Sequence, residues 1–299
     1  MMIGMCFGWK RAGNLAADYV FDKELLVGIA RLPKRQRELA MKEFGKREWR
    51  RCSEDLLYWV DESKHPAMPY VYTHDPHVYF LCAICNDGNS YQAKQRKSHL
   101  KLVHEMEPKN EVELGGYYSE LPTIRPFPLH DYMLPIIDAW LNSQYLLIQK
   151  SRDMIATWTT VLCYTWDSLF HEGRQNIFQS EDSSKTFDLV KRAWLIYKHQ
   201  PTFLKKVHPA RAGAGTAKAG VMRIESLNSE IMGFPQGADQ IRQYHPSGIF
   251  LDECAYLVDA GPTFAAVKPA IENGGRFTAV SSANPSWFWK ACDDSLDTL

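Results

Sequence analysis

Two adjacent carboxylates, Asp252 and Glu253, follow a short apolar run in the segment 247–256, SGIFLDECAY. The run 249–251 has the character of a buried strand, so both acids are expected at the carboxyl edge of a sheet, where doubly wound folds bind ligands. In a nucleotide hydrolase the first acid of such a pair holds Mg²⁺ through water, and the second orients the attacking water. Strands also end in Asp-Glu at ordinary turns, so the pair alone is a weak signal.

The segment 150–157, KSRDMIAT, follows the apolar run 145–148 and precedes a predicted helix, which is the place of a phosphate-binding loop. The usual loop reads G-x-x-x-x-G-K-[ST], and its backbone amides hold phosphates at a helix N-terminus. Only Thr157 remains of that pattern, as the Mg²⁺-binding hydroxyl; Ile155 replaces the second glycine and Ala156 the lysine. By this general pattern, the segment is not a phosphate-binding loop.

A second set of residues with metal-binding chemistry lies in the segment 79–104. Cys82 and Cys85 form a C-x-x-C pair, thirteen residues separate Cys85 from His99, and four separate His99 from His104. This is the spacing of a ββα zinc finger, in which a knuckle presents two thiolates and a helix presents two imidazoles. A finger of this size depends on Zn²⁺ for its folding energy.

The identity of the histidine ligands and the role of the finger stay open. His74 and His77 are alternative ligands, and the plain alternative is a chance cysteine pair beside surface histidines. Basic residues on the predicted finger helix permit phosphate contact. A lone finger serves equally as a structural or protein-binding module.

The predicted elements place Thr157 and the two acids in one α/β domain. Because strands alternate with helices, we expect a doubly wound, mostly parallel sheet. A helical N-terminal module over 1–120, with the finger at about 79–106, precedes this domain, which spans 121–299. Two helices within 25–62 are expected to break near Phe44-Gly45. Strands are predicted at 145–149, 175–180, 221–227, 247–252 and 277–282, and helices at 129–143, 157–171, 184–198 and 262–273.

Composition favours an intracellular soluble protein with local basic patches. The chain has 299 residues, 45% of them apolar, and a formal net charge of zero. Residues 31–51 carry nine basic and three acidic side chains, which permits nucleic-acid contact without requiring it. Seven scattered cysteines do not form a disulfide framework. No signal peptide is recognisable, and no apolar run approaches the ~18–20 residues that span a bilayer.

Four motifs in order give the chain a resemblance to a known family. K-S-R-D-M-x-x-T-W follows an apolar strand, and PQGAD-x-x-R-x-Y, FLDECAY and SSANP come after it. Together they resemble the ATPase domain of phage large terminases, the motors that pump double-stranded DNA into a procapsid, over roughly residues 122–290. The resemblance implies a RecA-like P-loop ATPase of the ASCE class that uses ATP and Mg²⁺. It also implies a homo-oligomeric ring with a portal protein and a small terminase subunit as partners, in the host cytoplasm and transiently at the portal vertex.

The resemblance also assigns roles to residues, because in this family the cation of a deviant loop sits at the start of the loop. Arg242 stands where the family can place an arginine finger that acts on a neighbouring subunit's nucleotide, a device worth about 10³–10⁵ in rate. The other implied roles are phosphate binding by Lys150, Ser151 and Arg152, Mg²⁺ binding by Thr157 and Asp252, water activation by Glu253, and coupling of hydrolysis to movement by Ser282, Ala283 and Asn284.

Two departures from the family pattern leave an alternative open. A β-branched residue such as Ile155 adopts positive φ only at a cost, so either nucleotide binding is weakened or the loop takes another path. The chain ends about fifteen residues after the coupling motif, and a nuclease domain would need ~150 more residues, so no DNA cleavage is expected. The alternative is a nucleic-acid-binding or assembly protein with a degenerate ATPase core, whose zinc finger carries the main interaction. A helicase is a third option, without a recognisable strand-separation motif.

Overall fold

The computed structural model describes residues 19, 21–60, 70–72, 124–127, 132–151, 154–212 and 220–296. The chain divides into two units, residues 1–69 with 129–299 and residues 70–128. In the second unit the described strands are β1 (Tyr70–Tyr72) and β2 (Ile124–Pro126), which pair antiparallel. The predicted zinc ligands Cys82, Cys85, His99 and His104 lie outside the described residues, so the finger stays a prediction.

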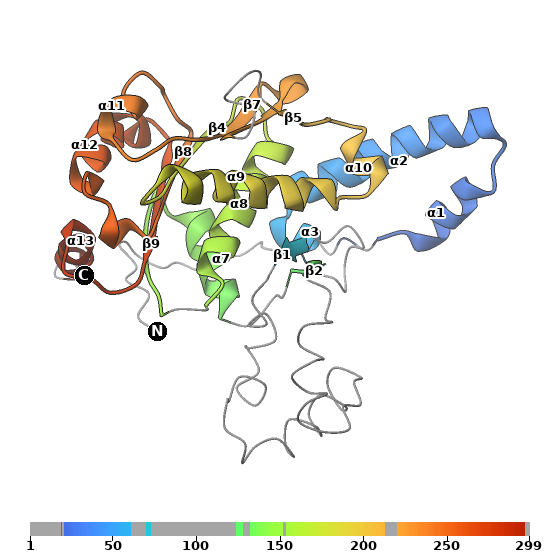
Figure 1. The fold of residues 1–299 in the computed structure, drawn as a ribbon. Helices are drawn as coiled ribbons and strands as arrows, with labels where there is room; N and C mark the ends of the chain where they lie inside the picture. Colours follow the sequence, from blue (N-terminus) through green and yellow to red (C-terminus); the bar gives the residue numbers. More distant parts are fainter. Residues whose placement is uncertain are drawn as a thin grey trace, which may run out of the picture. The chain divides into compact units, whose positions relative to one another are not determined.

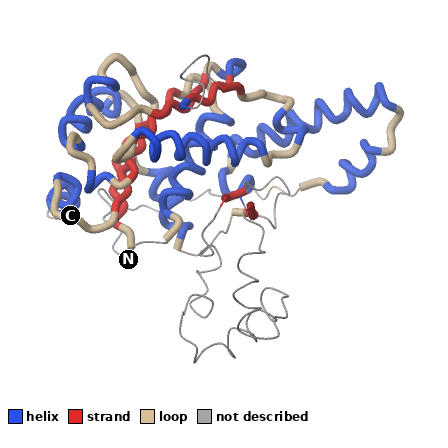
Figure 2. Tube along the Cα trace, in the orientation of Figure 1, coloured by secondary structure: helices blue, strands red, loops and turns tan. Residues whose placement is uncertain are grey.

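The larger unit is built on a seven-stranded sheet with the order β3-β9-β8-β4-β7-β6-β5 (Figures 1 and 2). The first five strands in this order are mutually parallel. Beyond β7, β6 pairs antiparallel with β7, and β5 pairs antiparallel with β6. The predicted mostly parallel α/β sheet is therefore confirmed. The strands are β3 (Tyr145–Gln149), β4 (Gln175–Gln179), β5 (Arg211–Ala212), β6 (Val221–Ile224), β7 (Ser229–Gly233), β8 (Gly248–Asp252) and β9 (Arg276–Ser281).

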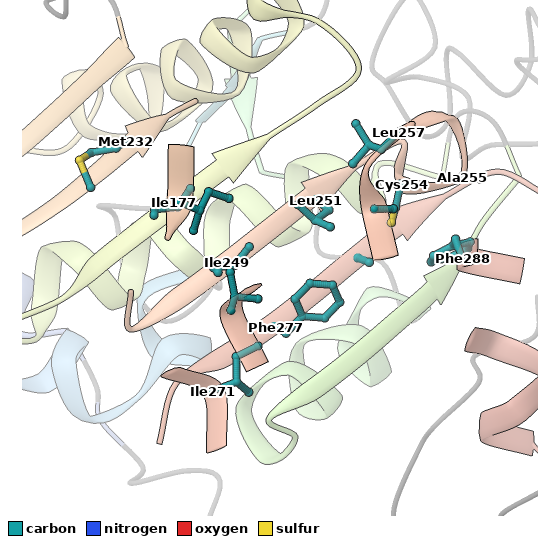
Figure 3. Packing of buried hydrophobic residues seen from close by; sticks show 14 of the residues in the cluster. Ile177, Met232, Ile249, Leu251, Cys254, Ala255, Leu257, Ile271, Phe277 and Phe288 are labelled. Atoms are coloured by element: carbon teal, nitrogen blue, oxygen red, sulfur yellow. The ribbon is translucent and has the colours of Figure 1, made fainter. Parts of the chain in front are cut away.

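Helices cover both faces of this sheet, which explains why β8 is buried along its whole length and is apolar up to Asp252. On one face, Ile249 and Leu251 of β8 pack with Ile271 and Phe288 (Figure 3). On the other face, Tyr164 donates its hydroxyl to the Ile249 carbonyl oxygen at 2.8 Å. The helices are α1 (Lys23–Ala30), α2 (Lys34–Glu54), α3 (Leu56–Val60), α7 (Met133–Asn142), α8 (Ala156–Phe170), α9 (Ser183–Lys198), α10 (Thr202–Lys205), α11 (Ala238–Ile241), α12 (Ala260–Glu272) and α13 (Trp287–Leu296).

The elements that were predicted in the α/β part have boundaries close to those observed, whereas β7 and α13 were not predicted. The strand predicted at 221–227 ends at Ile224, and a 3-10 turn over Glu225–Leu227 leads through Asn228 into β7. Asn228 has φ 50°, the left-handed conformation that asparagine tolerates in tight turns. The turn reverses the chain within a few residues and leads into β7, a strand that the sequence analysis did not predict.

The expected helix break near Phe44-Gly45 is wrong, because α2 runs through both residues. The chain breaks instead at Pro33 and Asp55, which flank this helix. A Cβ atom on Gly45 would lie 2.6 Å from the carbonyl oxygen of Phe203. Glycine is therefore required at this position for the close approach of α10 and does not end the helix.

Helices α1–α3 belong to the same unit as the sheet. The Trp166 indole of α8 donates to the Cys52 carbonyl oxygen of α2 at 2.7 Å, and the Trp59 indole donates to Gln200 Oε1 at 2.7 Å. Both bonds lie in buried surroundings, where an indole N–H needs a partner. The N-terminal helices thus support the C-terminal end of α8, opposite to the end that carries Thr157.

Candidate active site

Three predicted segments meet at the carboxyl edge of the sheet because β9 lies between β3 and β8. The strand register sets Gln149 of β3 opposite Ser281 of β9, and Asp252 of β8 opposite Val280. The loop that begins at Lys150, the coupling motif and the two acids therefore leave the sheet side by side. This is the edge at which open α/β sheets bind ligands.

Lys150 contacts the second acid directly. Its ammonium nitrogen lies 3.0 Å from Glu253 Oε1, and its backbone N–H donates to the Ser281 carbonyl oxygen at 3.0 Å. The Lys150 side chain is 11% exposed and that of Glu253 29%, so water screens this ion pair less than a surface pair. A lysine at the start of the loop therefore reaches the place where the general pattern puts its cation.

Thr157 contacts the first acid. Its hydroxyl donates to Asp252 Oδ1 at 2.8 Å from the first turn of α8. Asp252 is only 8% exposed, and burial raises the pKa of its carboxyl, while the charge of Arg192 and the Thr157 hydrogen bond oppose that rise. The hydroxyl and carboxylate expected to hold Mg²⁺ are thus adjacent and partly shielded from water.

Ile155 adopts the left-handed conformation, with φ 51° and ψ 12°, immediately before α8. Ile155 therefore adopts a conformation that favours glycine, at the cost of backbone strain. Among the described residues, Ile155 makes no side-chain cap to this helix, so first-turn N–H groups of α8 can face an anion.

A second residue at this edge of the sheet, Glu253, also has a strained backbone. Glu253 has φ 50°, and among the described residues Ile155, Asn228 and Glu253 are the non-glycine residues with positive φ. Asn228 lies in a turn that suits its residue type, so the two costly cases both border the site. Strained residues of this kind persist where the surrounding structure holds them, and they cluster at active sites.

The predicted coupling residues adjoin the turn that holds Glu253. The backbone N–H and hydroxyl of Ser282 both lie 3.5 Å from Glu253 Oε2, and Asn284 Nδ2 donates to the Ala255 carbonyl oxygen at 3.2 Å. Ser281 accepts from the Ala255 N–H at 3.0 Å. Ala283 is exposed in the same loop. A displacement of the Glu253 carboxylate therefore has a direct path to this loop.

Arg242 is not brought into this cluster. Arg242 follows α11 and pairs with Asp239 at 3.1 Å, and their side chains are 63% and 90% exposed. An exposed arginine is free to act on another molecule, but its role as a finger stays a prediction. Ser151 is exposed in the loop, and Arg152 lies outside the described residues.

The residues present fit Mg²⁺ with a nucleotide. Magnesium ions prefer hard oxygen ligands, keep several waters, and use one or two protein oxygens together with phosphates. Thr157 and Asp252 supply such oxygens, Lys150 supplies a cation, and the uncapped start of α8 supplies N–H groups. Within the described ranges, no group of three or more His, Cys, Asp or Glu side chains could hold a metal by itself, so phosphate oxygens are needed to complete the ligand set.

One residue of this region carried no signal in the sequence. Arg192 of α9 places its guanidinium 5.0 Å from the centre of the Trp158 ring, and its charge acts on Asp252. A single arginine in an amphipathic helix is usually solvated, and neither its spacing nor its neighbours indicate a site. Only the packing of α9 against α8 brings it here.

Comparison with known proteins gives likeness of fold alone. No protein-family model and no curated protein matches the sequence. Similar solved structures include the large terminase ATPase domain of Thermus phage P74-26, in two crystal structures with 11% identity and TM-scores of 0.43 and 0.41, over 55% of this chain and 69% of that chain. The large terminase of bacteriophage HK97 is 13% identical with a TM-score of 0.47, over 58% of this chain and 38% of that chain. The match thus spans well under half of the HK97 protein.

Proposed function

We propose that this chain is a Mg²⁺-dependent ATPase. The observation that carries the proposal is the double contact at the sheet edge, with Lys150 at 3.0 Å from Glu253 and Thr157 at 2.8 Å from Asp252. The segment 150–157 thus meets both acids of FLDECAY, as a phosphate-binding segment must if it is to share a nucleotide with them. The left-handed Ile155 supports the same reading, since it keeps the backbone on a glycine's path.

The side chains divide the work of hydrolysis among them. When a nucleotide binds, Lys150 leaves Glu253 and pairs with phosphate oxygens. Glu253 is then free to orient a water molecule and accept its proton. Thr157 and Asp252 hold Mg²⁺, which neutralises charge on the phosphates when it is bound. Ser282, which lies at the limit of hydrogen-bonding distance from Glu253, registers the change and passes it to the loop after β9.

We further propose that hydrolysis moves double-stranded DNA, as in the motor part of a phage large terminase. The four-motif order in the sequence supports this step. It brings with it a ring of subunits with Arg242 acting in trans, a portal protein and a small terminase as partners, and action in the host cytoplasm. The zinc finger at Cys82, Cys85, His99 and His104 remains part of the proposal, together with its Zn²⁺.

The alternative, an assembly protein with a degenerate ATPase core, rested on Ile155. Its argument was that a β-branched residue closes the loop to phosphate. Ile155 occupies the left-handed conformation, which supports a backbone suited to phosphate in spite of the residue type. The bulk of the Ile155 side chain stays the feature that favours the alternative, and the titration below distinguishes the two.

Calorimetric titration with a slowly hydrolysed ATP analogue and Mg²⁺ tests the proposed function. Lys150→Ala should abolish or strongly weaken binding, because a charge-assisted contact contributes about 1.5–3 kcal/mol, or roughly 10- to 150-fold. Lys268→Ala is the matched control, since its side chain is 54% exposed on α12. Unchanged binding by Lys150→Ala would remove the role from this lysine and favour Arg152. No binding by the unaltered protein at millimolar analogue would overturn the ATPase proposal.

A further inference from the structure

Arg192 stands beside the candidate site on an element that no predicted motif includes. It lies on α9, which follows β4, and its guanidinium lies 5.0 Å from the ring centre of Trp158, the residue after Thr157. A cation over a tryptophan face is held in place electrostatically. Arg192 is therefore fixed next to the first turn of α8, where Thr157 meets Asp252.

The Arg192 guanidinium has no hydrogen-bond or ion-pair partner among the residues that the structure describes. Its neighbour Lys191 shows the contrast, since that exposed lysine pairs with Asp188 at 2.7 Å. Burial lowers the pKa of Arg192, and Asp252 is the first charge that opposes this shift. Arg192 is partly exposed, and its guanidinium N–H groups have no protein acceptor among the described residues. The guanidinium is therefore available to an anion that arrives with a ligand.

Arg192 and Lys150 approach the acids from opposite flanks. In the sheet order β3-β9-β8-β4, Lys150 follows β3, and Arg192 lies on the helix that follows β4, with β8 and its two acids between them. Lys150 compensates Glu253, and Arg192 compensates Asp252. A polyphosphate at this edge would meet a cation on each side, and a guanidinium can bind phosphate oxygens in a bidentate manner.

We infer that Arg192 is a second phosphate-binding residue of this site and that it takes the terminal phosphate of the nucleotide from the flank opposite to Lys150. The inference rests on the proposed function. The terminal phosphate is favoured because Arg192 lies over Trp158, the residue next to Thr157, and its charge acts on Asp252, the two residues that would hold Mg²⁺. Trp158 acts as the positioning residue that holds the guanidinium until the ligand arrives.

Calorimetric binding of two ligands, Mg²⁺ with ADP and Mg²⁺ with a slowly hydrolysed ATP analogue, tests the inference. Arg192→Gln should weaken binding of the ATP analogue about tenfold or more, the usual effect of losing a charge-assisted hydrogen bond. Its effect on ADP should be clearly smaller. The affinity of Arg192→Lys for the ATP analogue should lie between these two, because lysine keeps the positive charge but lacks the planar guanidinium that binds two phosphate oxygens at once. Lys191→Gln removes a neighbouring positive charge from the exposed face of α9 and should bind both ligands as the unaltered protein does.

The outcomes separate the inference from the proposed function. If the unaltered protein binds the ATP analogue and Arg192→Gln binds it equally well, the inference is overturned and the ATPase proposal stands. An equal loss for ADP and the ATP analogue would place Arg192 at the metal site and would also overturn it. If the unaltered protein binds neither ligand, both fall. Thermal unfolding of Arg192→Gln should match that of the unaltered protein, which excludes misfolding as the cause of a loss.

Discussion

Two buried carboxylates of this chain, Glu48 and Asp252, have opposite surroundings. Glu48 of α2 is fully buried and has a complete set of partners: it accepts from the Tyr58 hydroxyl at 2.7 Å and pairs with Arg47 at 3.2 Å and Arg51 at 3.1 Å. Burial, followed by the hydrogen bond to Glu48, raises the pKa of Tyr58. Asp252 is nearly as buried, yet among the described residues its hydrogen bond comes from Thr157 alone.

The difference separates a carboxylate that stabilises the fold from one that is kept for a ligand. A complete buried network contributes to stability, and an incomplete one is costly. The backbones differ in the same way, because α2 is regular around Glu48, whereas Ile155 and Glu253 beside Asp252 are held in left-handed conformations. Proteins accept such costs at sites where binding or catalysis requires them.

The largest expected effect is the loss of stability in Glu48→Ala. The substitution leaves Tyr58 and two arginines without their shared partner, so the free energy of unfolding should fall by about 3 kcal/mol. Urea denaturation measures this fall. Binding of the ATP analogue by the folded protein should be unchanged, because Glu48 has no contact with the site edge.

Glu43→Ala is the matched control for this prediction. Glu43 lies on the same helix and pairs with Lys46 at 2.9 Å, with side chains 62% and 53% exposed. Removing a surface pair of this kind should change stability by less than about 1 kcal/mol. Equal effects of the two substitutions would mean that the Glu48 network does not stabilise the helices.

The α/β elements could be predicted because their patterns are local. The apolar strand before Lys150 and the apolar run of β8 before Asp252 each carry their own signal. The role of Gly45 could not be predicted in this way, because the carbonyl oxygen that it accommodates belongs to Phe203, far along the chain. A glycine in a sequence looks the same whether it ends a helix or permits a close contact, and only packing decides between them.

A smaller effect, of opposite sign, is expected for Asp252→Asn. Because burial raises the pKa of Asp252 in the folded protein, ionisation weakens the fold as pH rises through that pKa. Asparagine keeps the oxygen that accepts from Thr157 and removes the charge. The variant should therefore be more stable than the unaltered protein at neutral pH, and the gain should vanish as pH falls toward the unfolded value of about 3.9.

Denaturation at several pH values, with nucleotide titration beside it, tests this prediction. The variant should gain stability at neutral pH and lose Mg²⁺-dependent binding of the ATP analogue. Asp239→Asn, at a side chain 90% exposed, should show neither change. If Asp252→Asn lowers stability at neutral pH, Asp252 belongs with Glu48 as a structural carboxylate.

The candidate site was predictable in part, for physical reasons that differ from residue to residue. Lys150, Thr157 and the two acids lie at strand or helix ends that sequence patterns mark, so their meeting follows once the strand order is known. Arg192 lies inside a helix and reaches the site only through the packing of α9 on α8. The conformation of Ile155 opposes its residue type, and no local preference could have indicated it.

The smallest expected effect concerns the left-handed conformation of Ile155. There, the usual order of stability between alanine and glycine should be reversed. In an ordinary helix, alanine is more stable than glycine by about 1 kcal/mol. At φ 51° a Cβ atom costs about 1–2 kcal/mol that glycine does not incur, so Ile155→Gly should be more stable than Ile155→Ala by about 1 kcal/mol. Lys191→Gly and Lys191→Ala, at an exposed position inside α9, should show the usual order under the same urea denaturation. If alanine also proves more stable at 155, the loop is not left-handed, and the strain that distinguishes the site edge from the Glu48 network is absent there.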